Sequence, residues 1–416
     1  MPVARATHSE PEDGPYRRFL RCYYLTTVCY DFVFAYAIYT VFFSIRGLTV
    51  FQIGLLLSWW TLTSIVLEIP TGALADCWSR RKMLALAPLV KGLCFLTWFL
   101  AGGSFYLFAL GFLLWSVGGT LSSGTSEALL YDTLVHYGKT ADYEKALGRR
   151  QFYFYIGLAV AGISGGLIAS YRMDWAVLLS VIPLLLSAVF ALLIDEAPRT
   201  ESTGEVRYLQ HIRLALGEMK SNKTLLRLVI YLLGISVLWD LEEFDQLYYR
   251  LAALPIWAFG IVSFVGSSLN ALGAGVAYRM KHRAFVMYAL PFASAVLLVL
   301  VSRFPCIPGI GLLLLCYFAI VPVEVLIESR VQHSIIGISR ATVTSATTLL
   351  TGLFGVGVPV MLGLMARAWG LPAIYFASAI QLLALSVWAF GVRGQMGPRR
   401  IEGSAESGRA VPRDNQ

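Results

Sequence analysis

Long apolar stretches separated by short polar links dominate the hydrophobic pattern of this chain. Each stretch is close to the ~20 residues that an α-helix needs to cross the hydrocarbon core of a bilayer. The pattern therefore predicts an all-α membrane protein with twelve spanning helices in two sets of six. The predicted helices cover 20–45, 50–75, 83–101, 105–134, 150–170 and 174–194 in the first set, and 225–249, 255–278, 284–302, 309–332, 340–367 and 371–393 in the second.

A polar segment between the two sets divides the chain into related halves. We predict a tail at 1–18, a six-helix bundle at 19–194, a linker at 195–223, a second bundle at 224–393 and a tail at 394–416. The linker is either an amphipathic helix on the membrane surface or a solvated connector. The halves repeat each other, because Cys-Tyr-Asp31 matches Leu-Trp-Asp240 and Glu127 matches Glu324. Parallel repeats of this kind place a substrate site between the halves, near the middle of the membrane.

Composition and charge agree with a membrane protein and orient it. Of the 416 residues, 57% are apolar and 14% are charged, and the net charge is +8. With both termini in the cytoplasm, that side carries 27 of the 33 Lys and Arg residues, and the outer loops carry five. Because this asymmetry follows the positive-inside rule, we predict a multi-pass protein of the inner (plasma) membrane with both termini cytoplasmic. The positive charge then reflects lipid and topology, and no nucleic-acid partner is predicted.

The link between the second and third predicted helices carries a distinctive motif. Residues 68–82 read Glu-Ile-Pro-Thr-Gly-Ala-Leu-Ala-Asp-Cys-Trp-Ser-Arg-Arg-Lys. This segment resembles the loop between helices two and three of major facilitator superfamily transporters, where Gly, any residue, Leu, Ala and Asp precede a Gly-Arg-Arg/Lys cluster. The matching residues are Gly72, Leu74, Ala75, Asp76, Arg80 and Arg81, and Ser79 stands in place of the family's second glycine.

Such a loop can act as a conformational gate. A carboxylate that caps one helix can pair with arginines, which clamps two helix ends in one conformation and releases them in another. We therefore expect Gly72, Asp76, Arg80 and Arg81 to form the gate. The alternative is a loop whose cations only set the membrane topology, with an incidental acid.

Several acidic residues lie inside the predicted helices. A charge at the bilayer centre costs about 2.5–3.5 kcal/mol on insertion scales, so an intramembrane acid is a functional candidate. The resemblance implies that helices one, four, seven and ten line a central cavity on which these acids converge, whereas Lys91 is the one clearly deep base. Burial and like-charged neighbours favour protonated carboxyls, as a proton-coupled carrier requires.

We predict that Asp31 and Glu127 carry proton coupling. The predicted substrate-binding residues are Tyr30, Trp115, Trp239, Asp240, Glu243, Glu324 and Glu328. Their aromatic members can stack on a cationic or planar substrate, or can simply pack against other helices. Four further acids lie near predicted helix ends, where they can equally be solvated or cap a helix. These are Glu68, Asp132, Glu242 and Asp245.

The leading functional interpretation is a secondary active transporter of the bacterial efflux type that works by alternating access. We expect proton-coupled export of a small cationic or zwitterionic organic molecule. Glycines at 157, 162, 165 and 166 resemble the antiporter motif of drug exporters, although that motif's proline and the arginine of the fourth helix are missing. The alternatives are a proton-coupled uptake permease for a small metabolite and a membrane sensor without transport.

Other classes of protein lack support in the sequence. There is no complete Gly-x-x-x-x-Gly-Lys-Ser/Thr phosphate loop, no His-rich metal set and no nucleophile elbow, so we predict no enzymatic activity and no cofactor. The expected partners are a small-molecule substrate, protons and the lipid bilayer, and the protein is expected to be a monomer.

Overall fold

The computed structural model describes residues 13–198, 217, 219–281, 283, 285–335 and 340–393, without the side chains at positions 13, 76 and 340–342. The predicted tails at 1–18 and 394–416 and the predicted linker at 195–223 therefore lie largely outside the described residues. The linker's two alternative interpretations stay predictions.

Helices make up both halves of the described chain. The first half contains α1 (Asp13–Asp31), η1 (Phe34–Ala37), α2 (Tyr39–Ile45), α3 (Val50–Cys77), α4 (Arg80–Leu100), α5 (Phe105–Ser122), α6 (Thr125–His136), η2 (Thr140–Asp142), α7 (Tyr143–Tyr171), α8 (Met173–Leu179) and α9 (Val181–Leu192). The second half contains α11 (Lys223–Glu242), α12 (Asp245–Leu251), η3 (Ile256–Ala258), α13 (Phe259–Met280), α14 (Val286–Arg303), α15 (Ile307–His333), α16 (Arg340–Trp369) and α17 (Pro372–Gly391).

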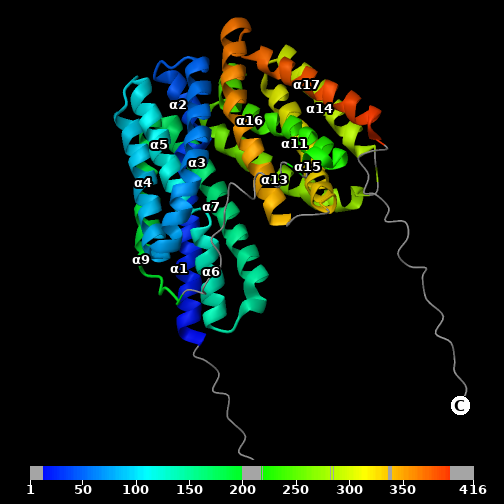
Figure 1. The fold of residues 1–416 in the computed structure, drawn as a ribbon. Helices are drawn as coiled ribbons and strands as arrows, with labels where there is room; N and C mark the ends of the chain where they lie inside the picture. Colours follow the sequence, from blue (N-terminus) through cyan, green and yellow to red (C-terminus); the bar gives the residue numbers. More distant parts are fainter. Residues whose placement is uncertain are drawn as a thin grey trace, which may run out of the picture.

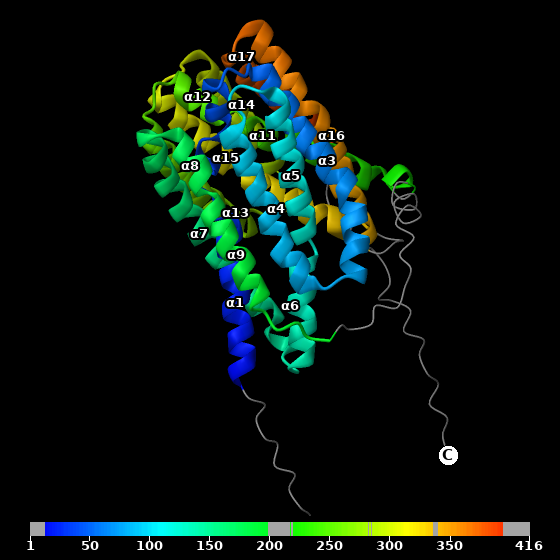
Figure 2. The ribbon, with the colours of Figure 1, turned by 90° about the vertical axis from the view of Figure 1, so that its left-hand side faces the viewer.

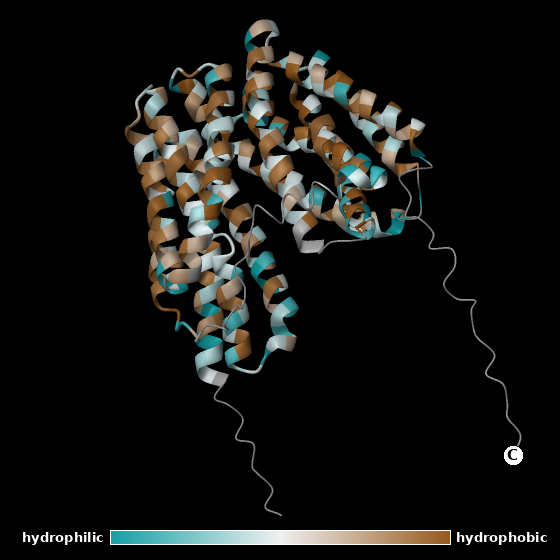
Figure 3. Cartoon of the chain, viewed as in Figure 1, coloured by the Kyte–Doolittle hydropathy of each residue, from teal (hydrophilic) through white to brown (hydrophobic). Residues whose placement is uncertain are grey.

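These elements form twelve membrane spans within the described residues, which confirms the predicted fold class. Apolar residues occupy most of the length of the spans (Figure 3). Large apolar side chains such as Val66, Leu272 and Val387 remain more than 60% exposed, as expected for a surface that faces lipid. An even number of spans puts both chain ends and the central linker on one side, which we call the linker side. The opposite side is the far side.

The spans form two bundles that meet at the far side. Figure 1 shows the first half and the second half converging at the top of the view, away from the start of α1, and diverging below. The view turned by 90° shows α3 beside α16 (Figure 2), and this pair and the pair α7 and α13 make the broadest helix contacts between the halves. In the first half α4 packs against α5 and α9, and in the second half α14 packs against α15 and α17.

Some of the described spans are interrupted, which the hydrophobic pattern did not predict. The first span breaks between α1 and η1, the fourth between α5 and α6, and the seventh between α11 and α12. A break leaves backbone groups without helical partners, and each such group must be satisfied within the membrane. At the first break Ser180 of α9's N-terminus helps, because its Oγ accepts a hydrogen bond from the Ala35 backbone N–H at 3.1 Å.

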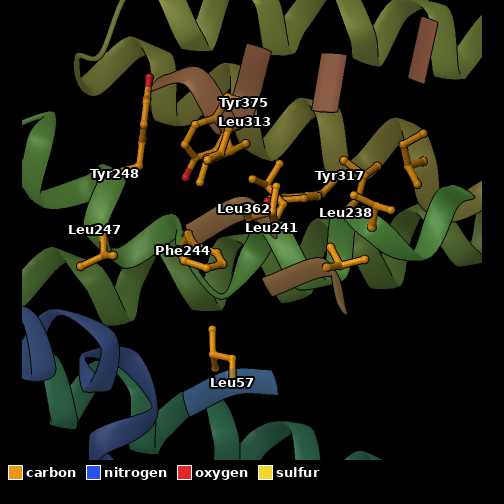
Figure 4. Packing of buried hydrophobic residues seen from close by; sticks show 14 of the residues in the cluster. Leu57, Leu238, Leu241, Phe244, Leu247, Tyr248, Leu313, Tyr317, Leu362 and Tyr375 are labelled. Carbon is orange, nitrogen blue, oxygen red and sulfur yellow. The ribbon is translucent and has the colours of Figure 1, made fainter. Parts of the chain in front are cut away.

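The core of the second half gathers around the interrupted seventh span. Leu238 and Leu241 of α11, Phe244 between α11 and α12, and Leu313 of α15 are fully buried. Figure 4 shows these side chains together with Tyr317 and Tyr375. This packing holds the break between α11 and α12 at the surface that faces the first half.

Close backbone crossings hold the halves together near the far side. A Cβ added to Gly260 of α13 would lie 1.9 Å from the carbonyl oxygen of Gly162 of α7, and one added to Gly54 of α3 would lie 2.3 Å from that of Pro359 of α16. Both glycines therefore permit contacts that no other residue allows without a backbone shift.

We predict that Gly260→Ala separates α7 from α13 and opens the far side. Overpacking against backbone costs about 1–3 kcal/mol, and this cost falls only on conformations in which the crossing is closed. Spin-label distances between the far-side ends of α7 and α13 should increase relative to the unsubstituted protein. Gly275→Ala is the matched control, because it lies on the same helix with nothing within 4 Å of its added Cβ. Equal distance distributions in both variants would contradict the prediction.

Candidate functional site

A cavity of about 510 Å³ lies between the two halves. Its first-half wall comes from η1, α2, α3, α5 and α7, and its second-half wall comes from residues 242–249, α13 and α15. Aromatic side chains provide much of the surface. They are Tyr36, Tyr39, Trp60, Trp115, Tyr155, Tyr249, Phe264 and Tyr317.

Three carboxyl groups line the same cavity. Glu242, Glu243 and Asp245 come from the interrupted part of the seventh span, around the break between α11 and α12. Among the described residues that line this cavity there is no Lys, Arg or His. An acidic wall beside aromatic faces is suited to a cation, through charge attraction and cation–π contact.

Tyrosine hydroxyls hold two of these carboxyls in place. Asp245 is 2% exposed and accepts hydrogen bonds from the hydroxyls of Tyr317 at 2.8 Å and Tyr375 at 2.9 Å. Glu243 accepts a short hydrogen bond from the hydroxyl of Tyr39 across the interface between the halves. The neighbouring Gln246 accepts from the backbone N–H of Thr40 at 3.0 Å. The acidic turn of the seventh span is thus bonded directly to the first span.

A buried ion pair lies behind the first-half wall of the cavity. The Lys91 ammonium is 2.8 Å from Oδ1 of Asp31, and Lys91 is 1% exposed. The ammonium also lies 3.8 Å from the ring centroid of Tyr30. The hydroxyl of Tyr36, a cavity-lining residue, donates to the same Asp31 oxygen at 2.9 Å. The sequence suggested Lys91 as an isolated deep base, but its charge is balanced by Asp31.

A second cavity of about 260 Å³ brings together the two predicted proton-coupling residues. Asp31 and Glu127 both line it, with Tyr30 and Arg150. Glu127 is exposed and accepts a hydrogen bond from Arg150 of α7 at 3.3 Å. Because Tyr36 links Asp31 to the central cavity, the Asp31 carboxyl lies between the two spaces.

Only some of the predicted substrate-binding residues line the central cavity. Trp115 and Glu243 line the central cavity, and Tyr30 lines the second one. Trp239 donates to Oε1 of Glu324 at 2.8 Å, and its ring stacks on the cavity residue Tyr317 with centroids 6.1 Å apart. Asp240 and Glu324 are partly buried, and Glu328 is exposed. None of these last three is among the described residues that line the central cavity.

Two of the four expected gate residues, Arg80 and Arg81, take part in a clamp within the first half. Arg80, at the start of α4, forms a short ion pair with Asp132 of α6, and its backbone N–H donates to Oε1 of Glu196 at 2.7 Å. Arg81 lies 3.5 Å from the carbonyl oxygen of Ile194. The Asp76 side chain is outside the described part of the chain, and a Cβ added to Gly72 would meet nothing within 4 Å. Whether the clamp opens during a transport cycle stays a prediction.

The sequence analysis did not assign several of the cavity residues to the site. Glu242 and Asp245 belong to an acidic run that pointed to the site, although their expected positions near a helix end left their role open. Tyr36, Tyr39 and Trp60 resemble ordinary packing residues in sequence. Only the break after Asp31 and the crossing of the halves turn them toward the cavity.

Comparison with known proteins gives the family. Residues 23–327 match the sequence model of the Major Facilitator Superfamily, which is more than half of the chain. The chain belongs to this superfamily. It is therefore a multi-pass membrane protein of a family of small-molecule transporters, with its cavity between two six-helix halves. The chain matches no curated protein sequence significantly.

Solved structures of other transporters share this fold. A bacterial homologue of the human lysosomal transporter Spinster, in an inward-facing and unoccupied conformation, has a TM-score of 0.73 and 15% identity, over 94% of this chain and 98% of that one. The nucleoside transporter NupG has a TM-score of 0.71 and 13% identity, over 91% and 98%. A D-xylose-proton symporter has a TM-score of 0.67 and 12% identity, over 90% and 97%. At these identities the likeness extends to the fold alone.

We predict that Lys91→Gln strongly destabilises the protein. Removing one partner of a buried ion pair leaves an uncompensated charge and costs about 3–5 kcal/mol. The free energy of unfolding of the purified protein in detergent should fall by this amount, and Asp31→Asn combined with Lys91→Gln should recover most of it. Arg46→Gln is the matched control, because its pair with Asp174 is about one-third exposed and contributes about 0–1 kcal/mol. Equal losses in Lys91→Gln and Arg46→Gln would contradict the prediction.

Proposed function

We propose that the protein is a secondary active carrier that exports a small cationic or zwitterionic organic molecule in exchange for protons, by alternating access. One observation carries this proposal. The cavity between the halves has three carboxyl groups and many aromatic faces, and its described lining has no cationic side chain. An anionic substrate would need arginine or lysine at these positions, whereas an organic cation fits both kinds of surface.

The Asp31–Lys91 pair offers a mechanism for proton coupling. When Asp31 is ionised it balances Lys91, and a cation can enter the neighbouring acidic cavity. When Asp31 takes up a proton, the Lys91 charge is no longer compensated, and it lies 5.4 Å from the ring of the cavity residue Tyr36. In a low dielectric the uncompensated ammonium repels a cation bound in the cavity beyond Tyr36. Proton uptake at Asp31 and cation binding therefore exclude each other, as an exchanger requires.

Glu127 is the second residue of the proposed proton route, after Asp31. It shares the 260 Å³ cavity with Asp31, so protons can pass between Asp31 and the linker side through a polar space. The positive-inside distribution of Lys and Arg supports a cytoplasmic linker side in the inner membrane. On this assignment the far-side contacts are the closed outer gate, and the structure corresponds to an inward-facing state. In the same proposal Gly72, Asp76, Arg80 and Arg81 control the inner side through the clamp on α6.

Proton-coupled uptake is the second candidate. It is favoured by the fold shared with a structure described as a D-xylose-proton symporter. Uptake and export differ in how proton binding affects substrate binding. A symporter binds the proton and the substrate together, whereas an exchanger binds them in turn. A sensor without transport would show neither saturable flux nor counterflow.

We predict that neutralising the ion pair or Glu127 uncouples transport from the proton gradient. In proteoliposomes, Asp31→Asn with Lys91→Gln, and separately Glu127→Gln, should retain exchange of an organic cation at equal pH but lose accumulation driven by a pH gradient. Glu243→Gln should lower both activities about tenfold or more, because a charged hydrogen-bonding group contributes about 1.5–3 kcal/mol.

Glu144→Gln is the control for this experiment, since Glu144 is an exposed carboxyl in the first turn of α7 outside both cavities. It should behave like the unsubstituted protein in both assays. Unchanged proton-driven accumulation in the double variant and in Glu127→Gln would refute the coupling assignment. Competition by organic anions, with none by cations, would refute the substrate class.

A further inference from the structure

A third cavity, away from the transport route, lies at the linker side of the first half. Its volume is about 270 Å³. It is formed where the first turns of α1 meet η2 and the start of α7. Its lining residues are Tyr16, Arg17, Leu20, Tyr24, Lys139, Asp142, Lys145, Ala146 and Arg149.

Positive charge converges on this cavity, which we call the basic pocket. Four cations and one carboxylate line it among the described residues. Lys145 and Arg149 are one helical turn apart on α7, so both side chains lie on the same helix face. Lys139 lies with its ammonium 4.5 Å from the ring centroid of Tyr16. The positive-inside rule explains cations on this side of the membrane, but not their convergence on one pocket.

A buried hydroxyl provides an independent sign of a ligand. The Tyr24 hydroxyl is buried and makes no hydrogen bond to the described residues around it. A buried polar group without a partner costs about 1–3 kcal/mol, and an acceptor bound in the pocket would remove this cost. Asp142 is itself an acceptor, but the hydroxyl does not bond to it.

Helix geometry separates this pocket from the proton route. Arg150 lines the cavity that contains Asp31 and Glu127, whereas its neighbour Arg149 lines the basic pocket. Consecutive residues of a helix point about 100° apart, so the two adjacent arginines line different cavities. The pocket lies near the linker-side ends of two candidate membrane spans, and the ends of spans lie close to the lipid headgroups. Leu20 gives it one apolar wall.

We propose that the basic pocket binds a phosphate group, with a phospholipid headgroup of the linker-side leaflet as the source that fits its depth. Lys145 and Arg149 supply charge-assisted hydrogen bonds to the phosphate oxygens, and the Tyr24 hydroxyl donates to a further oxygen. The bound group ties the start of α1 to the start of α7. Free phosphate has the same chemistry, and the experiment distinguishes the two sources.

The test uses the full-length purified protein and native mass spectrometry. The protein is titrated with phosphatidylglycerol, and in a second arm inorganic phosphate is added as a competitor. Lys145→Gln with Arg149→Gln should weaken phosphatidylglycerol binding about tenfold or more, and Tyr24→Phe about threefold. Arg279→Gln with Lys281→Gln is the matched control, because both residues are exposed on the linker side of α13 and the charge change is equal.

The outcomes decide between specific and diffuse binding. Selective loss in the α7 variant and in Tyr24→Phe supports the pocket, and displacement of the lipid by inorganic phosphate would identify a soluble phosphate as an equal occupant. Equal loss in the α7 and α13 double variants would overturn the proposal, because the attraction would then be general to the basic side. Absence of binding by both phosphatidylglycerol and inorganic phosphate would overturn it as well. Tyr24→Phe removes one hydroxyl only, so it remains informative if the double variant misfolds.

Discussion

The cost of placing charge in hydrocarbon shapes the interior of this protein. A charge at the centre of a bilayer must be paired, hydrated or neutralised, since an uncompensated charge there costs several kcal/mol. The two halves meet this constraint differently. The first half balances Asp31 with Lys91. The second half places Glu242, Glu243 and Asp245 around a cavity, and tyrosine hydroxyls bond to Glu243 and Asp245. One half is therefore locally neutral and the other acidic, and the proposed cation site lies at their shared surface.

Helix breaks and close crossings produce this arrangement. The break between α11 and α12 brings the three carboxyls to the interface, and the break after Asp31 brings Tyr36 and Tyr39 to the opposite wall. The glycine crossings bring the walls within reach, so that Tyr39 can bond to Glu243. Direct contacts between the halves thus include the close helix crossings and the acidic turn of the seventh span.

Much of the fold follows from the sequence, because spanning length and charge asymmetry are local properties. The twelve spans were predicted from spanning length and the superfamily from the motif at 68–82, and both are confirmed. The site was predicted less completely, because it depends on contacts between distant residues. Lys91 meets Asp31 across 60 positions, and Arg80 meets Asp132 of α6. No periodicity specifies these partners. The aromatic wall was missed for a similar reason, since an aromatic residue of a spanning helix packs against lipid or protein as readily as it lines a cavity.

Proton release on cation binding tests the central claim most directly. Isothermal titration of the purified protein with an organic cation, in buffers that differ in ionisation enthalpy, measures how many protons the protein exchanges with solvent. If proton uptake at Asp31 and cation binding in the acidic cavity exclude each other, binding must release protons, and the cation affinity must rise with pH. Release that disappears in the double variant Asp31→Asn with Lys91→Gln would agree with coupling through this pair. Binding without proton release, or with proton uptake, would contradict the account.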